Sequence, residues 1–278
     1  MRLEKEVRFS YRQARRTAVK EIRKAEKVGM ESCPKDLKNV IGDIKIAKTV
    51  DLGILEIPVD QIVGASVFED KRLYSPDFLP AAAENSLYAD RWNRIYLDYL
   101  SDEGWDSPIS CFEFLGRFYV QDGKKRVSVL KAHGAAVTKA AVTRIMPVLN
   151  QDAEIVAYYE FLNDYKKTGL YQVAFTQPGS FANLQKLMGH SQDYVWNDND
   201  RFRFLFHLPA VACALENAFE GRLHITPADA MVALMEAYSM NELGRMQPWD
   251  LTKLLQDSWV KLFKIADPDF EAAPIGAA

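Results

Sequence analysis

The stretch 117–134 constrains the fold of this chain most, because it joins a strand to a helix through a single short turn. Its sequence is RFYVQDGKKRVSVLKAHG. Residues 117–120 have the character of a strand, Asp122 and Gly123 form a turn, and the next segment predicts a short helix that ends at Gly134. The fold must therefore place a strand end and a helix start side by side at this turn.

The predicted helix begins with three cations, Lys124, Lys125 and Arg126. The helix dipole disfavours positive charge at an N-terminus, whereas the free N–H groups of the first turn attract anions. A negatively charged ligand, such as a phosphate group, would offset the unfavourable charge. The alternative is a solvated basic turn after a hairpin, and the local sequence leaves both interpretations open.

Neighbouring segments predict further strands, at residues 54–63, 108–114 and 140–145. A tight turn at Leu115 and Gly116 should pair the second of these strands with 117–120 as an antiparallel hairpin. A helix is predicted between the first two strands. The segment around the basic turn is therefore a small mixed α and β region.

The order of these elements and their short motifs resembles the ParB/sulfiredoxin superfamily over residues 50–148. The matching segments are IPVDQIVG at 57–64, DKRLYSPDFLP at 70–80, SPISCFEFLGRFYVQDGKKRVSVLKAHG at 107–134 and AAVTRIMP at 140–147. The Gly-x-x-Arg turn of the family corresponds to residues 123–126. The resemblance implies a small mixed-sheet domain with a phosphate or nucleotide site at this turn.

Departures from the family pattern narrow the expected chemistry. Lys124 stands where sulfiredoxin has its catalytic cysteine, so thiol chemistry is not expected. Other relatives carry histidine where this chain has Lys124 and Lys125, and lysine is charged near neutral pH, which suits phosphate binding better than proton transfer. ParB itself holds cytidine triphosphate at this turn and continues into a helix-turn-helix region that reads DNA, for which this chain shows no convincing match.

The predicted phosphate-binding residues share the turn and the loop that the resemblance places beside it. They are Arg72, Asp122, Gly123, Lys124, Lys125, Arg126 and Ser128. Arg72 would give a bidentate grip on phosphate. Glu69 and Asp70 are candidates for a catalytic base or a magnesium ligand in phosphoryl transfer, and a plain surface role is the competing interpretation.

Length and composition predict a globular chain of about two domains. We expect an α+β fold with a basic helical arm at 1–48, a ParB/sulfiredoxin-like mixed-sheet domain at 49–148 and an all-helical domain at 149–278. The sequence has no apolar run of about 18 residues, no signal-peptide core and no cysteine spacing typical of disulfides or zinc. These features predict a cytoplasmic protein without a membrane partner.

The arm carries a net positive charge, unlike the chain as a whole. Residues 1–27 hold ten basic and four acidic side chains, whereas the whole chain has a net charge of −3. Residues 9–28 predict a helix in which Arg12, Arg16, Lys20 and Lys24 form one basic stripe. Such a stripe is typical of contact with nucleic acid phosphates, but we favour the interpretation that the helix covers the acidic remainder of this chain or of a second copy.

The C-terminal half contains helix start and stop signals. The predicted N-terminal caps are Asp152, Ser180, Asp198 or Asp200, Thr226 and Asp250. Pro209 should kink or split the third of these helices, and Thr226 followed by Pro227 is a strong start. This half shows no catalytic motif.

Three functions remain open from the sequence. The first is a cytoplasmic nucleotide- or phosphate-binding protein, regulatory or DNA-associated, whose ligand would be a nucleoside di- or triphosphate with Mg²⁺. The second is a small-molecule kinase or nucleotide hydrolase that uses Glu69 or Asp70. The third is a non-catalytic scaffold for a protein partner.

Overall fold

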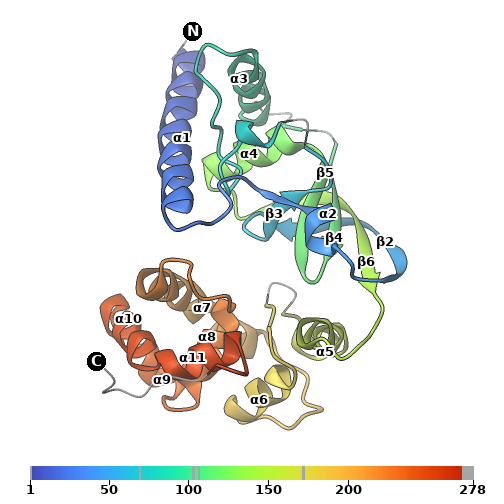
Figure 1. Ribbon diagram of the computed structural model, residues 1–278, viewed down its shortest axis with the longest axis vertical. Coiled ribbons are helices and arrows are strands. Elements are labelled where there is room, and N and C mark those ends of the chain that lie inside the picture. The colour runs from blue at the N-terminus through green and yellow to red at the C-terminus, as the bar shows by residue number, and fades with distance from the viewer. Residues whose placement is uncertain (1, 69, 102–103, 106, 171–172, 271–278) are drawn as a thin grey trace. The chain divides into compact units, whose positions relative to one another are not determined.

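The computed structural model describes residues 2–68, 70–101, 104–105, 107–170 and 173–270 (Figure 1). The chain divides into two compact units, Met1–Val148 and Leu149–Ala278. The first combines helices with a mixed sheet and the second contributes helices, which confirms the predicted α+β class.

The first unit is built on a six-stranded sheet in the order β1-β3-β5-β4-β6-β2. The strands are β1 (Lys35–Asp36), β2 (Ile46–Pro58), β3 (Ile62–Ala65), β4 (Ile109–Phe114), β5 (Arg117–Asp122) and β6 (Val137–Pro147). The β4–β5 and β6–β2 pairs are antiparallel, and the other neighbours are parallel. The sheet is therefore mixed, as the sequence predicted.

The β4–β5 hairpin turns at the two predicted residues. Leu115 and Gly116 have φ values of 50° and 74°, and positive φ at both positions matches the twist of an antiparallel pair. The buried carboxylate of Glu113 accepts a 2.8 Å hydrogen bond from the Gly116 amide and pairs with Arg144 on β6. This carboxylate therefore links the turn to the next strand of the sheet.

Three helices lie together beside the sheet in Figure 1, namely α1 (Arg2–Lys27), α3 (Leu87–Tyr99) and α4 (Lys124–His133). Their buried side chains share one core with β2 to β6. A second cluster around Phe114 and Tyr119 packs with residues of the short α2 (Leu37–Ile41). A 3₁₀ helix, η1 (Lys71–Leu73), precedes α3.

The indole of Trp92 joins the three helices in the core. It is fully buried, donates a 3.0 Å hydrogen bond to the hydroxyl of Ser128 on α4, and meets the ring of Tyr11 on α1 edge-on at 5.1 Å. The Tyr11 hydroxyl donates to the carbonyl of Ala82 at 2.9 Å. The basic helix at the start of the chain is thus packed against α3 and α4 within the first unit.

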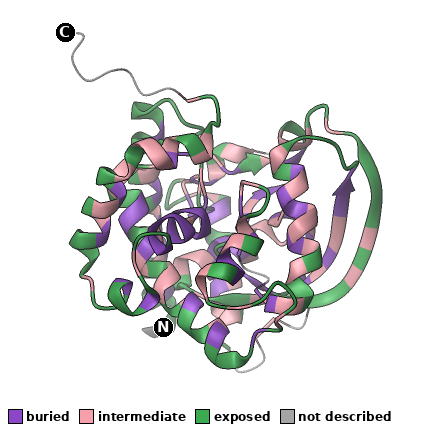
Figure 2. Ribbon diagram, turned by 90° about the horizontal axis from the view of Figure 1, so that it is seen from below, coloured by how far each residue is buried: buried purple, intermediate pink, exposed green. Residues whose placement is uncertain are grey.

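The second unit contains α5 to α11. Their bounds are α5 (Ala153–Thr168), α6 (Ser180–Leu187), α7 (Asp198–Phe219), α8 (Pro227–Met235), α9 (Met240–Leu243), α10 (Pro248–Asp257) and α11 (Trp259–Ala266). Residues 228–235 of α8 are all buried, which marks it as the central helix of this unit (Figure 2).

Several predicted helix starts are confirmed. Asp152 caps α5 through the amides of residues 154 and 155, and Thr226 caps α8 in a reciprocal pair with Asp229. The predicted cap Ser180 is instead the first residue of α6, after Gly179.

The last helices differ in several details from what the sequence predicted. The cap of α7 is Asn197, with Asp200 as its reciprocal partner, and α7 continues through Pro209 without splitting. Asp250 lies at the third position of α10, where it accepts from the Gln247 amide. The chain then breaks at Ser258, so the single last helix that we expected is two, α10 and α11.

Candidate functional site

The candidate site lies where β5 ends and α4 begins. Gly123 is the N-cap of α4 and has φ 102°, a conformation that side chains rarely adopt. A Cβ atom here would lie 2.7 Å from the Cγ2 atom of Ile109 on β4. Glycine is therefore required both by the backbone and by the close approach of the neighbouring strand.

The first turn of α4 presents its amides without a cap. Gly123 has no side chain to accept from them, and the first turn of any helix lacks carbonyls of its own for these N–H groups. The Gly123 carbonyl accepts the first helical bond, from the Val127 amide at 2.9 Å. The amides of residues 124–126 can therefore donate hydrogen bonds to a bound anion.

A pocket of about 300 Å³ opens at this helix start. Its lining residues are Phe68, Asp70, Leu73, Tyr74, Ile95, Asp122, Gly123, Lys124, Lys125 and Arg126. One part of the lining is the polar turn, and the other is apolar and aromatic. The pocket thus combines the two surfaces that a phosphate group and an attached organic group would need.

Arg126 is held by the protein itself. Its Nη1 atom donates to the carbonyls of Ser107 at 2.7 Å and Pro108 at 3.3 Å, and its Nη2 atom donates to Asp122 at 3.1 Å. The side chain is only 16% exposed. The guanidinium therefore anchors the segment before β4 while it also lines the pocket at the helix start, and its expected role in gripping an anion stays a prediction.

Lys124 and Lys125 are the cations left for a ligand. Both are partly exposed and line the pocket, and neither forms an ion pair with any of the residues that the structure describes. The Lys125 ammonium lies 5.5 Å from the centre of the Tyr88 ring, a cation–π contact that positions it without neutralising its charge. The charge of these two lysines is thus uncompensated.

The two carboxylates of the pocket are already paired. Asp122 is matched by Arg126, and Asp70 caps η1 and forms an ion pair with Arg72 at 2.9 Å. The hydrogen bond from Arg72 lowers the pKa of Asp70 below its usual value. A carboxylate with a lowered pKa is a weak general base, although it remains a good ligand for a cation.

The remaining predicted residues lie apart from the pocket lining. The Arg72 side chain is 89% exposed and turns to Asp70, and Ser128 is fully buried with its hydroxyl bonded to Trp92. Glu69 lies outside the described residues. The structure therefore brings together Asp70, Asp122 and the turn 123–126 and leaves Arg72 and Ser128 outside their pocket.

Sequence reasoning missed the apolar side of the site. Phe68, Leu73 and Tyr74 come from the loop around η1, and Ile95 comes from α3. The aromatic rings of residues 68 and 74 lie 6.1 Å apart. The only signal was the aromatic content of the segment 68–78, which a core position explains equally well.

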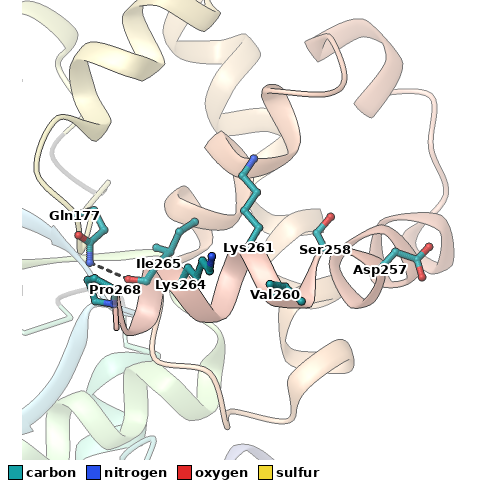
Figure 3. A pocket seen from close by; sticks show the side chains of 8 residues that line it. All are labelled: Gln177, Asp257, Ser258, Val260, Lys261, Lys264, Ile265 and Pro268. Atoms are coloured by element: carbon teal, nitrogen blue, oxygen red, sulfur yellow. Dashed lines mark hydrogen bonds between the residues drawn. The ribbon is translucent and has the colours of Figure 1, made fainter. Parts of the chain in front are cut away.

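A second hollow, of about 620 Å³, lies along α11 in the helical unit (Figure 3). The side chain of Gln177 reaches the carbonyl of Ile265 at 2.8 Å, and the Lys261 amine extends to the carbonyl of Ala233 and the carboxylate of Glu236. Both polar groups are used within the unit. This hollow therefore offers fewer polar groups that could bind a ligand than the turn of α4 does.

Comparison with models of known protein families finds no match, and comparison with curated proteins finds no similar sequence. The resemblance to the ParB/sulfiredoxin superfamily rests on its motifs and stays a prediction. A scan of the described helices finds none with both the length and the apolar character that crossing a membrane requires.

Proposed function

We propose that the first unit binds a phosphate-bearing small molecule at the start of α4, with a nucleotide as the best fit. One observation carries this proposal: uncapped helix amides and two uncompensated lysines face the same pocket. The amides and the helix dipole favour an anion, and Lys124 and Lys125 add charge at the same place. Membership of the ParB/sulfiredoxin superfamily is part of the proposal.

The apolar lining supports a nucleotide over free phosphate. Phe68 offers aromatic surface, and Leu73 and Ile95 offer aliphatic surface, next to the nearly buried ring of Tyr74, and a nucleobase or ribose can pack there. The volume of about 300 Å³ lies at the lower end of small-molecule pockets, which favours a mononucleotide. Asp70 or Asp122 would hold a magnesium ion that accompanies the phosphates and offsets their charge, because carboxylate oxygens are ligands that this ion prefers.

The geometry favours binding over catalysis. A phosphoryl-transfer enzyme needs a group that orients or deprotonates the acceptor, and the lowered pKa of Asp70 makes it a poor base. We therefore favour a regulatory binding protein over a kinase or hydrolase. The three free cysteines, at positions 33, 111 and 213, support a reducing compartment such as the cytoplasm.

Thermal shift measurements with nucleoside mono-, di- and triphosphates, with and without Mg²⁺, test this proposal. We expect at least one nucleotide to raise the melting temperature of the full chain. The double variant Lys124→Gln/Lys125→Gln should lose this shift and keep the melting temperature of the unliganded protein.

The matched control is Lys48→Gln/Lys139→Gln, which removes the same charge from exposed positions on β2 and β6. This control should keep the full nucleotide shift. If no nucleotide changes the melting temperature, or if both double variants lose the shift equally, the α4 site does not bind nucleotides. Turnover of a nucleotide by the wild type would revive the enzyme alternative.

A further inference from the structure

The helix α1 carries a continuous basic face along its exposed side. Seven cations recur at intervals of three or four residues, which places them on one side of an α-helix. They are Lys5, Arg8, Arg12, Arg16, Lys20, Arg23 and Lys27. We call these seven residues the α1 stripe. All of them are exposed, whereas Val7, Ala14 and Ala18 on the opposite side are buried.

The stripe has very little internal compensation. Among the residues that the structure describes, only Arg12 of the seven forms an ion pair, with Glu84 at 2.9 Å. The exposed acids of the helix, Glu4, Glu6 and Glu26, lie at the edges of the stripe. Six exposed cations without an ion pair to any described residue therefore project a net positive field into solvent.

The packing of α1 decides which polyanion fits this face. Its apolar side is buried against α3 and α4, so it cannot enter a membrane as an amphipathic helix would. Among the described residues of α1, Phe9 is the one exposed aromatic residue, and a single ring is too little for the serial base stacking of single strands. A row of cations without a row of exposed aromatic rings suits the regularly spaced phosphates of a duplex better than a single strand.

We propose that the α1 stripe binds the phosphate backbone of a nucleic acid duplex without reading its sequence. From residue 5 to residue 27 the helix rises about 33 Å, close to the roughly 34 Å of one duplex turn. Over that length a duplex presents a phosphate about every 1.7 Å of its axis. The α1 stripe thus matches one turn of a duplex in length and is opposite to it in charge. None of its residues lines the pocket at α4.

Fluorescence anisotropy of the full chain with a labelled 20-base-pair duplex tests the proposal. DNA and RNA duplexes of equivalent sequence serve as two arms, because both present the same phosphate chemistry, and the single strand serves as a third. We expect duplex binding at 50 mM salt that weakens about 10³-fold by 200 mM, with a log–log slope near −5 for six contacts. The single strand should bind more weakly.

Four charges of the stripe are removed in the variant Arg16→Gln/Lys20→Gln/Arg23→Gln/Lys27→Gln. Glutamine has a good helix propensity, so α1 should still fold. We expect it to lose at least about 100-fold in duplex affinity. The matched control Lys35→Gln/Lys38→Gln/Lys45→Gln/Lys48→Gln removes four exposed charges from the segment that contains α2 and the start of β2. It should stay within about threefold of the wild type, because these lysines lie outside the proposed contact.

Several results would overturn the assignment. They are no duplex binding by the wild type at 50 mM salt, equal losses in the two quadruple variants, or a single strand that binds as tightly as the duplex. Equal competition by an acidic polypeptide such as polyglutamate would identify a protein partner instead. The Lys124→Gln/Lys125→Gln variant should bind duplex normally, which separates this test from that of the nucleotide pocket.

Discussion

Replacing Arg126 with alanine tests whether this residue anchors the fold or grips a ligand. In the structure, its guanidinium donates hydrogen bonds to the carbonyls of Ser107 and Pro108 and to the carboxylate of Asp122. The shortest of these bonds is 2.7 Å. The substitution should therefore destabilise the protein before any ligand is added. A residue that only held an anion would leave the unliganded protein unchanged.

The expected magnitude follows from the exposure of each partner. Asp122 is 82% exposed, so the ion pair contributes less than about 1 kcal/mol. The hydrogen bonds to the carbonyls come from a charged donor that is mostly buried, and together they contribute about 2 kcal/mol. A total loss of about 2–3 kcal/mol should lower the melting temperature by about 5–10 °C for a unit of this size.

Circular dichroism melting of the unliganded wild type, Arg126→Ala and Arg126→Lys separates the two roles. Lysine keeps the positive charge but lacks the planar fork that reaches two acceptors at once, so Arg126→Lys should recover less than half of the lost stability. The reasoning is refuted if both variants melt within about 1 °C of the wild type, a difference well below the shift expected above. If such stable variants also lost the nucleotide-induced rise in melting temperature, Arg126 would be assigned to ligand binding.

Three further substitutions or reactions test the surroundings of the site. Gly123→Ala should cost about 1–3 kcal/mol in the free energy of unfolding because of its φ and the approach of Ile109, whereas Gly53→Ala, with positive φ but open space, should cost less. Glu113→Ala should cost about 3 kcal/mol because it leaves the Arg144 charge without its buried partner, and Glu56→Ala on the exposed side of β2 should be nearly neutral in the same urea titration. Burial raises the pKa of Cys111 to about 12, so at pH 8 only about one thiol in 10⁴ is ionised. In native protein, mass spectrometry after iodoacetamide treatment should therefore find the exposed Cys213 alkylated and Cys111 intact, and rapid native labelling of Cys111 would contradict its burial.

The parts of the fold that could be predicted are those with local signals. The turn at Leu115 and Gly116, the stop of α4 at Gly134 and the Thr226 cap of α8 are each determined by residues within a few positions. The first part of β2 could not be predicted, because most of residues 46–56 are exposed and show no apolar alternation. Its pairing with β6 through the backbone holds it in the sheet.

The candidate site shows the same division. Three cations after a glycine turn predicted an anion site, yet the sequence could not distinguish Arg126 from its two neighbours. The acceptors that hold its guanidinium include carbonyls of Ser107 and Pro108, and every residue type carries such a carbonyl. The positions of Phe68 and Tyr74 beside α4 could not be predicted either. These residues are about 50 positions before α4 in the sequence, and the fold, not a local pattern, brings them to the pocket.

Three sets of cations in the first unit should respond differently to salt. Arg126 is bonded inside the protein, Lys124 and Lys125 face a pocket, and the α1 stripe faces solvent. Raising salt from 50 to 200 mM should weaken duplex binding about 10³-fold, because six exposed contacts release counterions.

The same change should weaken nucleotide binding less than about tenfold, since two lysines and uncharged amides hold that ligand in a sheltered pocket. Both affinities can be measured on one preparation by anisotropy and calorimetry. A parallel decline of the two would mean that the same cations hold both ligands, because separate sites with different numbers of contacts cannot share one salt dependence.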